Sequence, residues 1–436
     1  MTGRTPPAGP ADIDLFDPAV QEDWYPTYDW LRSNSPVWQL PGTRTFFLTR
    51  YEDVTHVLRR PDLFRRGQGD DTPVKSRPTR SAAIYEQRGW PPRLPLAIDP
   101  PDHRRYRELV DPFFSNQGAA RRRELIERVT NDLIDGFCAG GRCEFVREFA
   151  LPLPVQIITV LLGFDVADIP ELKAWSEAWV LPFRGPLSEE EEIWVAERRV
   201  EFQHHIHDTI EQKRRRPDDS VISYLANDAR FGGERPLEDG EIIGMIDHLY
   251  IGGNETTTFA LTSGLWLLLS VPGVYDAVRR ERTKVRNLVE EVLRLESPTQ
   301  GLPRVAARDT DIGGVPIPAG ATVHLRYAAA NRDPEMFPDP EVLDLTRPNS
   351  ARHVAFSLGE THCPGAGLSR LEQVVALEAL VDRLPDLHLL PGNDFKHHSN
   401  FTLRAMKELH IGFTPVHPVA TPGDPEGSGT PPPPAS

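Results

Sequence analysis

Cys363 is the first residue whose type and position indicate chemistry. It follows a short apolar stretch and a glycine-bearing loop, and it precedes a helical pattern that opens with Pro364, which suits a first helical turn. At a helix N-terminus, the dipole and the free N–H groups stabilise a cysteine as its thiolate. Residue chemistry alone leaves four interpretations open: an inert buried thiol, a nucleophile, a redox sensor or a metal ligand.

A second candidate site lies inside a long helical pattern. Residues 238–270 form one continuous run, which at about 1.5 Å per residue would extend roughly 50 Å and must therefore pass through the core. The segment 251–258, Ile-Gly-Gly-Asn-Glu-Thr-Thr-Thr, places poor formers of a buried helix in its middle. A local conflict of this kind is typical of a functional site.

The residues around the cysteine form the motif F-x-x-G-x-x-x-C-x-G, made by Phe356, Gly359, Cys363 and Gly365. This motif resembles the cysteine loop of the cytochrome P-450 family of haem-thiolate monooxygenases. Four other segments resemble the family's signatures and occur in the same order. They are 99–107 (DPPDH and Arg107), 252–256 (GGNET), 291–294 (EVLR) and 331–340 (NRDPEMFPDP). The resemblance extends from about residue 17 to about residue 413.

The resemblance implies haem b as the cofactor and Cys363 as the axial ligand of its iron. In the family the phenylalanine, here Phe356, packs beside the sulfur, and the glycines, here Gly359 and Gly365, let the backbone approach the porphyrin. Pro364 lacks an N–H, so the expected donors to the sulfur are neighbouring amides such as that of Gly365.

Haem carries two propionates, which need cationic partners where they are partly buried. His103, Arg107 and Arg304 fit this role by their position in the family pattern, and solvated surface charge is the alternative interpretation. The chain departs from the commoner bacterial form at Thr361, where a propionate-binding His or Arg is usual. His362, one position later, and His353, earlier in the loop, are the two candidates to compensate for that change.

Gly252 and Thr256 are four residues apart and share a helix face, with Glu255 beside it. The small residue Gly252 leaves room for dioxygen, and the resemblance implies that Gly252 and Gly253 contact the haem. It assigns hydrogen bonding and the ordering of water to Thr256, and proton relay to Glu255. The alternative is structural: Thr256 would bond back to a helix carbonyl, and Glu255 would make a buried ion pair.

Glu291 and Arg294 are three residues apart on a predicted helix and can pair. The resemblance implies a buried network that holds the loop below the haem, with Arg347 as a candidate third member. We interpret these residues as structural.

Family-like placement puts Ile251, Leu302 and Phe401 in a pocket for a hydrophobic substrate. The segment 65–96 also belongs to the predicted roof, and it carries a local charge of +4 in an acidic chain. One interpretation is that the substrate, or a protein carrying it, is anionic. A solvated mobile lid is the other.

The elements that must position these residues are mostly helices. Periodicity predicts helices at 171–180, 189–215, 238–270, 285–295 and 367–383, and strands within 37–48 and 315–327. The prediction is a mainly α fold with a minor β-sheet component, the cytochrome P-450 fold, with haem between the long central helix and the cysteine-loop helix. We expect one domain at 12–419, a disordered N-terminal segment at 1–11 and a disordered Pro/Gly-rich tail at 420–436.

Composition narrows the function classes. The net charge of −15 over 436 residues argues against a general nucleic-acid binder. No apolar run approaches the roughly 18 residues that a membrane span needs, so no membrane association is expected. Three cysteines are too few for a disulfide framework and suit a reducing, cytoplasmic setting.

The predicted function is a monooxygenase that uses dioxygen to hydroxylate or epoxidise a hydrophobic small molecule in secondary metabolism. Because the chain has no G-x-G-x-x-G fingerprint for flavin or nicotinamide, a separate ferredoxin and ferredoxin reductase would supply electrons. Two alternatives remain open. One is a haem-thiolate enzyme doing peroxide-driven oxidation, aromatic coupling or nitration, and the other is a non-catalytic haem fold that recruits a partner.

Overall fold

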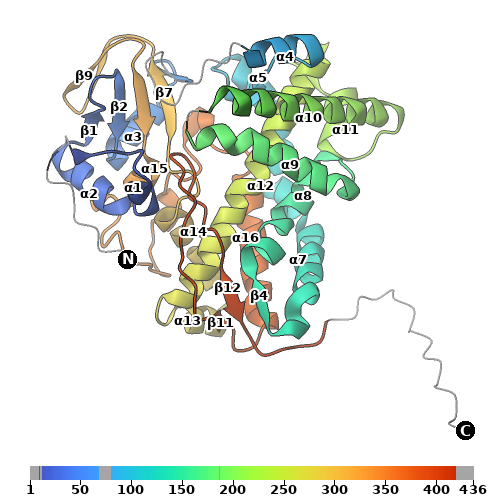
Figure 1. The fold of residues 1–436 in the computed structure, drawn as a ribbon, viewed down its shortest axis with the longest axis vertical. Coiled ribbons are helices and arrows are strands. Elements are labelled where there is room, and N and C mark those ends of the chain that lie inside the picture. The colour runs from blue at the N-terminus through green and yellow to red at the C-terminus, as the bar shows by residue number, and fades with distance from the viewer. Residues whose placement is uncertain (1–8, 10–11, 68–79, 186, 419–436) are drawn as a thin grey trace, which may run out of the picture.

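The computed structural model describes residue 9 and residues 12–67, 80–185 and 187–418 (Figure 1). The terminal segments predicted to be disordered, 1–11 and 420–436, lie outside the described residues apart from Gly9. Helices make up 56% of the structure, and the β-sheets are small. The sheet with β1, β2 and β7 lies to one side of the molecule, and most of the long helices lie to the other (Figure 1).

The α-helices vary from a single turn to 32 residues. They are α1 (Pro18–Glu22), α2 (Tyr25–Asn34), α3 (Tyr51–Leu58), α4 (Arg80–Arg88), α5 (Asp102–Phe114), α6 (Asn116–Ala120), α7 (Arg123–Phe137), α8 (Pro152–Leu162), α9 (Ile169–Val180), α10 (Glu189–Arg215), α11 (Val221–Asn227), α12 (Asp239–Ser270), α13 (Val274–Arg280), α14 (Lys284–Leu295), α15 (Tyr327–Ala330) and α16 (Ala366–Arg383).

The main sheet has five strands in the order β1-β2-β10-β7-β3, and a smaller one has the order β11-β12-β4. Two further strand pairs complete the set. The strands are β1 (Val37–Gln39), β2 (Thr45–Leu48), β3 (Phe64–Arg66), β4 (Arg142–Glu144), β5 (Arg230–Phe231), β6 (Arg235–Pro236), β7 (Leu302–Ala306), β8 (Thr310–Ile312), β9 (Val315–Ile317), β10 (Thr322–Leu325), β11 (His388–Leu389) and β12 (His410–Gly412).

The long helix α12 organises the helical part of the molecule. It begins with a capping box, in which Glu238 and Glu241 each accept a hydrogen bond from the other's backbone N–H. It ends at Ser270, ahead of a turn in which Gly273 has φ of +80°. Most of its residues are buried, and α8 and α16 pack against it. Figure 1 shows α12 running through the middle of the helical region, with α16 beside it.

The sheet order places two cationic residues opposite each other. Strand β3 pairs antiparallel with β7, so that Arg66 faces Arg304 across the ladder. Strand β7 in turn pairs with β10, whose residues belong to a separate apolar core between the sheet and α3. Strand β3, which precedes α5 in the chain, and strand β7, which follows α14, are therefore neighbours at one edge of the sheet.

The predicted elements are found, with small changes at their ends. The ranges 189–215 and 238–270 match α10 and α12, and the other three predicted helices match α9, α14 and α16 within two residues. The predicted strand region 37–48 forms the hairpin β1–β2, and the region 315–327 contains β9 and β10, which belong to different sheets. Helices α2, α3, α7 and α8 were not predicted; α8 is apolar on nearly every side, which hides the helical period.

Among the described residues, no single helix is long and apolar enough to cross a membrane. Only α12 and α13 taken together reach that length and composition, and the pair is bent by 98° at its junction.

The carboxyl group of Glu372 on α16 is buried without a charged partner. The residue is 1% exposed, and its Oε2 atom has no hydrogen-bond partner among the described residues. Burial raises the pKa of Glu372 to about 8. The folded protein therefore keeps this proton at pH values where the unfolded chain, with a pKa of 4.5, has lost it.

We predict that Glu372→Gln removes a pH-dependent loss of stability. Wild type should lose stability as the pH rises from about 4.5 to about 8 through this group, and the variant should be more stable at pH 8 by about 1 kcal/mol or more. Urea unfolding at several pH values measures this difference. Glu378→Gln, on the same helix but only partly buried, is the control and should give a smaller change. Equal pH profiles for wild type and Glu372→Gln would contradict the prediction.

Candidate functional site

Cys363 lies just ahead of α16, on the side of the molecule where that helix packs against α12. The helix begins at Ala366, with Gly365 as its N-cap. This start is two residues after Pro364, where the sequence suggested the first helical turn. The backbone N–H of Cys363 donates to the carbonyl of Phe356 at 2.9 Å, which closes the loop between them. The motif residues Phe356, Gly359 and Gly365 are therefore gathered around the sulfur-bearing residue.

Two opposing effects act on the pKa of the Cys363 thiol. Burial raises the pKa of Cys363, whereas hydrogen bonds from the backbone amides of Gly365 and Ala366 lower it. In the polypeptide alone the effect of burial is the larger, so the pKa of Cys363 lies above its usual value. These two amides are the donors expected from the sequence, and their effect on the pKa of the thiol is smaller than that of burial.

Two residues of the cysteine loop have left-handed backbone conformations. Gly359 has φ of +61°, a conformation that glycine adopts without strain. Ser357 has φ of +60°, which is uncommon for a residue with a side chain. The Ser357 hydroxyl shares a hydrogen bond of 2.8 Å with the Thr361 hydroxyl, and this bond offsets part of the strain.

One face of α12 carries His248, Gly252 and Thr256, which follow one another at intervals of four residues. Gly252 is exposed although it lies in the middle of a buried helix, and a Cβ added to it would meet nothing within 4 Å. An open space therefore lies beside this face. The Nδ1 atom of His248 has no partner among the described residues, and burial lowers the pKa of His248 to about 4, so the ring is neutral at pH 7.

Gly253 has a different environment from the one predicted. A Cβ on Gly253 would lie 3.0 Å from the side chain of Ile158 on α8. This glycine thus permits close packing of two helices, and its small size does not serve the open space at Gly252. Its predicted role as a cofactor contact is corrected on that ground.

Glu255 and Thr256 adopt the contacts of the structural alternative. The Glu255 carboxylate pairs with Lys173 of α9 at 2.6 Å and accepts a hydrogen bond from Ser176 at 3.2 Å. The hydroxyl of Thr256 donates to the carbonyl of Gly252 at 3.1 Å, yet its side chain is beside the open space. Lys173 was not predicted, because nothing in its local sequence relates α9 to α12.

A group of cations lies between the cysteine loop and β7. Arg107 donates to the carbonyl of His362 at 2.7 Å, and Arg304 donates to the Thr361 hydroxyl at 3.1 Å. His103 is 1% exposed, and neither of its ring nitrogens has a partner among the described residues. Burial and then Arg66 lower the pKa of His103 to about 4. A cavity of about 600 Å³ is lined in part by His103, Arg107 and Gly359.

These observations allow a test of whether the residues suit haem. The cationic group and the unpartnered nitrogens of His103 suit a ligand with carboxylates, and the open space at Gly252 lies on the helix that packs against the cysteine helix. A thiol with two amide donors suits a metal-bound sulfur. The residues present therefore fit a flat, dianionic iron cofactor.

Two of the predicted site residues are engaged elsewhere. The side chain of His353 is fully buried, with Nε2 at 3.1 Å from Glu290 and Nδ1 accepting from the N–H of Ala355 at 3.2 Å. It has no free nitrogen for a propionate, which corrects that prediction. Phe401 is 2% exposed and stacks on Phe16 at 4.9 Å, inside an aromatic cluster of the core. It therefore has no surface for a substrate, and its predicted place in the pocket is wrong.

The other two predicted pocket residues differ in their exposure. Leu302 is 37% exposed on β7, so it has apolar surface available to a ligand. Ile251 is 4% exposed and belongs to the main core cluster. His248 lies on the open face of α12 and was not among the predicted residues, although its spacing from Gly252 was a usable signal.

The Glu291 and Arg294 pair is a buried ionic network. Both side chains are fully buried, and Arg294 Nε lies 2.7 Å from Glu291 Oε1. Arg347 Nε lies 3.1 Å from the same carboxylate, which confirms it as the third member. The two guanidinium groups also donate to the carbonyls of Asn331, Pro338, Asp339, Pro340 and Val342.

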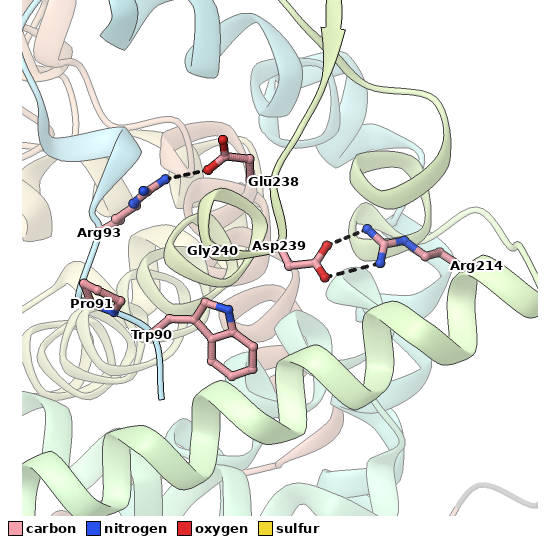
Figure 2. Close-up of a pocket in the computed structure, with 7 residues that line it drawn as sticks. All are labelled: Trp90, Pro91, Arg93, Arg214, Glu238, Asp239 and Gly240. Atoms are coloured by element: carbon pink, nitrogen blue, oxygen red, sulfur yellow. Dashed lines mark hydrogen bonds and ion pairs between the residues drawn. The ribbon is translucent and has the colours of Figure 1, made fainter. Parts of the chain in front are cut away.

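Two arginines of the basic segment 65–96 pair with carboxylates of other elements. Arg88 pairs with Glu197 at 2.9 Å, and Arg93 pairs with Glu238 at 3.0 Å. Residues 68–79, with Lys75 and Arg77, lie outside the described residues. Figure 2 shows the Arg93–Glu238 pair and the Arg214–Asp239 pair at a pocket of about 500 Å³, beside Trp90. Trp90, Pro91 and Arg93 of the predicted roof segment 65–96 line that pocket, but none of the individually predicted catalytic, cofactor-binding or substrate-pocket residues does.

The family model described as Cytochrome P450 matches residues 179–411. A putative cytochrome P-450 140 of Mycobacterium tuberculosis is 34% identical over 421 residues, which cover 94% of this chain and 93% of the relative. The vitamin D(3) 25-hydroxylase of Pseudonocardia autotrophica is 34% identical, and the match covers 93% of this chain and 98% of the relative. The 6-deoxyerythronolide B hydroxylase of Saccharopolyspora erythraea is 32% identical, with 91% and 98% covered.

Solved structures show the same similarity. The haem domain of a cytochrome P-450 of Tepidiphilus thermophilus gives a TM-score of 0.84 at 26% identity, covering 93% of this chain and 97% of that chain. A cytochrome P-450 in complex with a hexadec-9Z-enoic acid ligated acyl carrier protein gives 0.81 at 28% identity, covering 91% and 99%.

The two neighbouring glycines of α12 predict opposite effects of one substitution. Gly252→Ala gains helix propensity of up to about 1 kcal/mol without a clash, whereas Gly253→Ala pushes on Ile158, which costs about 1–3 kcal/mol. We expect the Gly252 variant to be the more stable by about 1–3 kcal/mol in thermal or urea unfolding. A Gly253→Ala protein as stable as Gly252→Ala would contradict the assigned packing.

Proposed function

The chain belongs to the cytochrome P-450 family of haem b monooxygenases, and from this premise we propose that it hydroxylates or epoxidises a hydrophobic small molecule. The observation that carries the proposal is the open space beside Gly252 and Thr256 on an otherwise buried helix, which packs against the helix that follows Cys363. Two relatives are named as hydroxylases, which favours hydroxylation. Those relatives also support a place in secondary metabolism.

Haem b, when bound, supplies the iron chemistry that activates dioxygen. Cys363 would bind its iron through the sulfur, toward which the backbone amides of Gly365 and Ala366 are directed. His103, Arg107 and Arg304 would bind the propionates. Such partners matter because a carboxylate that leaves water needs charge-assisted hydrogen bonds in exchange.

Glu255 and Thr256 are the proposed proton donors on the substrate side. Thr256 holds its proton on Oγ1 beside the open space, and it exchanges the Gly252 carbonyl for a water molecule during turnover. Glu255 must leave Lys173 and take up a proton from solvent before it can deliver one to that water, so the 2.6 Å ion pair is its contact before proton delivery. This division of labour suits general-acid delivery in a pocket that excludes bulk water.

The substrate would be mostly apolar with a limited polar contact. Leu302 offers apolar surface, and the neutral ring of His248 offers one hydrogen-bonding nitrogen on the face of α12. The pairing of Arg88 and Arg93 with Glu197 and Glu238 weakens the case for an anionic substrate. A carrier-bound substrate remains a hypothesis, to which the acyl carrier protein complex of one structural relative lends support.

We propose a ferredoxin and its reductase as electron donors, since family members receive electrons from redox partners. Arg121 and Arg122 follow α6, which packs against the cysteine helix, and they have no ion-pair partner among the described residues. They are suited to contact an acidic protein near Cys363. All three cysteines are free, which suits a cytoplasmic protein.

The first prediction of this proposal concerns the iron ligand. The dithionite-reduced protein with carbon monoxide should show a strongly red-shifted Soret band, and Cys363→Ser should lose it, because the shift requires a thiolate on the iron. Hydrophobic compounds are then screened for a change in the resting Soret band. A bound compound should be oxygenated with ferredoxin, reductase, NAD(P)H and dioxygen.

Three results would contradict the proposal. They are the absence of haem, a red-shifted band that survives in Cys363→Ser, and product formation with peroxide alone but not with dioxygen. The last result would favour the peroxide-driven alternative.

A second prediction concerns proton delivery. Glu255→Gln should lower kcat by about 100-fold or more, with a larger solvent isotope effect, because it removes a general acid. Haem binding and the carbon monoxide spectrum should stay unchanged. Thr258→Val is the matched control, since Thr258 donates only to the carbonyl of Asn254 at 3.0 Å inside the core. Equal turnover in wild type and Glu255→Gln would contradict the assigned role.

A further inference from the structure

Arg66 and Arg304 form a pair of like charges across the edge of the main sheet. They are direct partners in the antiparallel pairing of β3 and β7. Residues so placed have Cβ atoms about 4.5–5.5 Å apart, and like charges there are destabilising. Arg304 is 6% exposed, and Arg66 is half-buried. A negative charge between or beside the two guanidinium groups would therefore offset their repulsion.

The contacts of Arg66 hold it in place but do not neutralise it. Its backbone N–H donates to the carboxylate of Asp99 at 2.8 Å, and its Nη1 donates to the carbonyl of Leu96 at 2.6 Å. No other hydrogen bond and no ion pair of this side chain occurs within the described part of the chain, although a guanidinium has five N–H donors. Burial, then Arg304 and Arg107, lower the pKa of Arg66 to about 10. Other cations thus outweigh Asp99 around it.

Thr361 has an indirect role in the same group. Its hydroxyl accepts from Nη2 of Arg304 at 3.1 Å and shares a 2.8 Å hydrogen bond with Ser357. It therefore orients Arg304, and it brings no positive charge of its own. At this position the usual family residue would be a cation.

We propose that Arg66 binds a haem propionate and supplies the positive charge that Thr361 lacks. This inference rests on the proposed function, because it takes the haem carboxylates as the ligand. Arg66 lies on β3, far from the cysteine loop in sequence. It would be a fourth propionate partner beside Arg107, Arg304 and His103. A carboxylate there would accept charge-assisted hydrogen bonds from two opposed guanidinium groups.

The test uses the haem-loaded protein and does not need a substrate. Arg66→Met should release haem to excess apomyoglobin about 10- to 100-fold faster than wild type, as expected for the loss of a hydrogen bond to a charged group. Its reduction potential should move to a more negative value, because a cation that favours the added electron is gone. Arg66→Lys keeps the charge, so it should retain most of the potential and lose part of the haem affinity.

Arg65→Met is the matched control. Arg65 is the exposed neighbour on the same strand, so it should leave the haem release rate and the potential unchanged. If Arg66→Met does not fold, Arg66→Gln carries the same two measurements. Release rates and potentials that match those of the control would overturn the role of Arg66 while leaving the proposed function intact. A wild-type protein without a thiolate-type carbon monoxide spectrum would instead overturn the proposed function.

Discussion

The carboxylate of Glu291 is the group on which the cysteine side of the molecule depends. It is fully buried, and it receives Arg294, Arg347 and the backbone N–H of Asp344 at 2.9 Å. Removing one member would leave an uncompensated charge in the core, which typically costs about 3–5 kcal/mol. The two arginines use their remaining N–H groups on carbonyls of the segment 331–342. That segment continues to the cysteine loop, where Asn331 accepts from the N–H of Val354 at 2.7 Å. A single buried anion thus fixes the path of the chain toward Cys363.

A second buried anion does the same for the N-terminal helices. Glu296 is 4% exposed and contacts Arg332 at 3.1 Å and Arg404 at 2.5 Å. Burial alone would raise the pKa of Glu296, yet Arg404 and Arg332 hold it below its usual range. Both arginines also lie over the ring of Tyr25 on α2. Glu291 lies on α14 and Glu296 directly after it, so one short helix anchors the segment before the cysteine and the start of the chain.

The sequence was most informative where chemistry and spacing coincide. The bounds of α10 and α12, the cysteine loop and the Glu291 network were all predictable, because caps, periodic apolar residues and fixed motif distances specify them. The sequence was least informative about whether a given residue faces the core, a neighbouring helix or an open space. Gly252 and Gly253 are neighbours with opposite surroundings, and Phe401 is in a core rather than a pocket. Contacts between distant elements, such as Lys173 with Glu255, leave no local signal at all.

The state of Cys363 shows why the cofactor is part of the fold's electrostatics. A helix N-terminus and two amide donors favour the thiolate, but burial raises the pKa of the free thiol. A metal ion reverses that balance, because a coordinating thiol is deprotonated by the positive charge of the metal. Of the three arginines beside the cysteine loop, Arg107 pairs with Asp111 at 2.6 Å, whereas Arg66 and Arg304 have no ion pair within the described part of the chain. In the proposed assignment, an iron porphyrin would supply a cation to the sulfur and carboxylates to Arg66 and Arg304, so one ligand would offset the charges on both sides of this site.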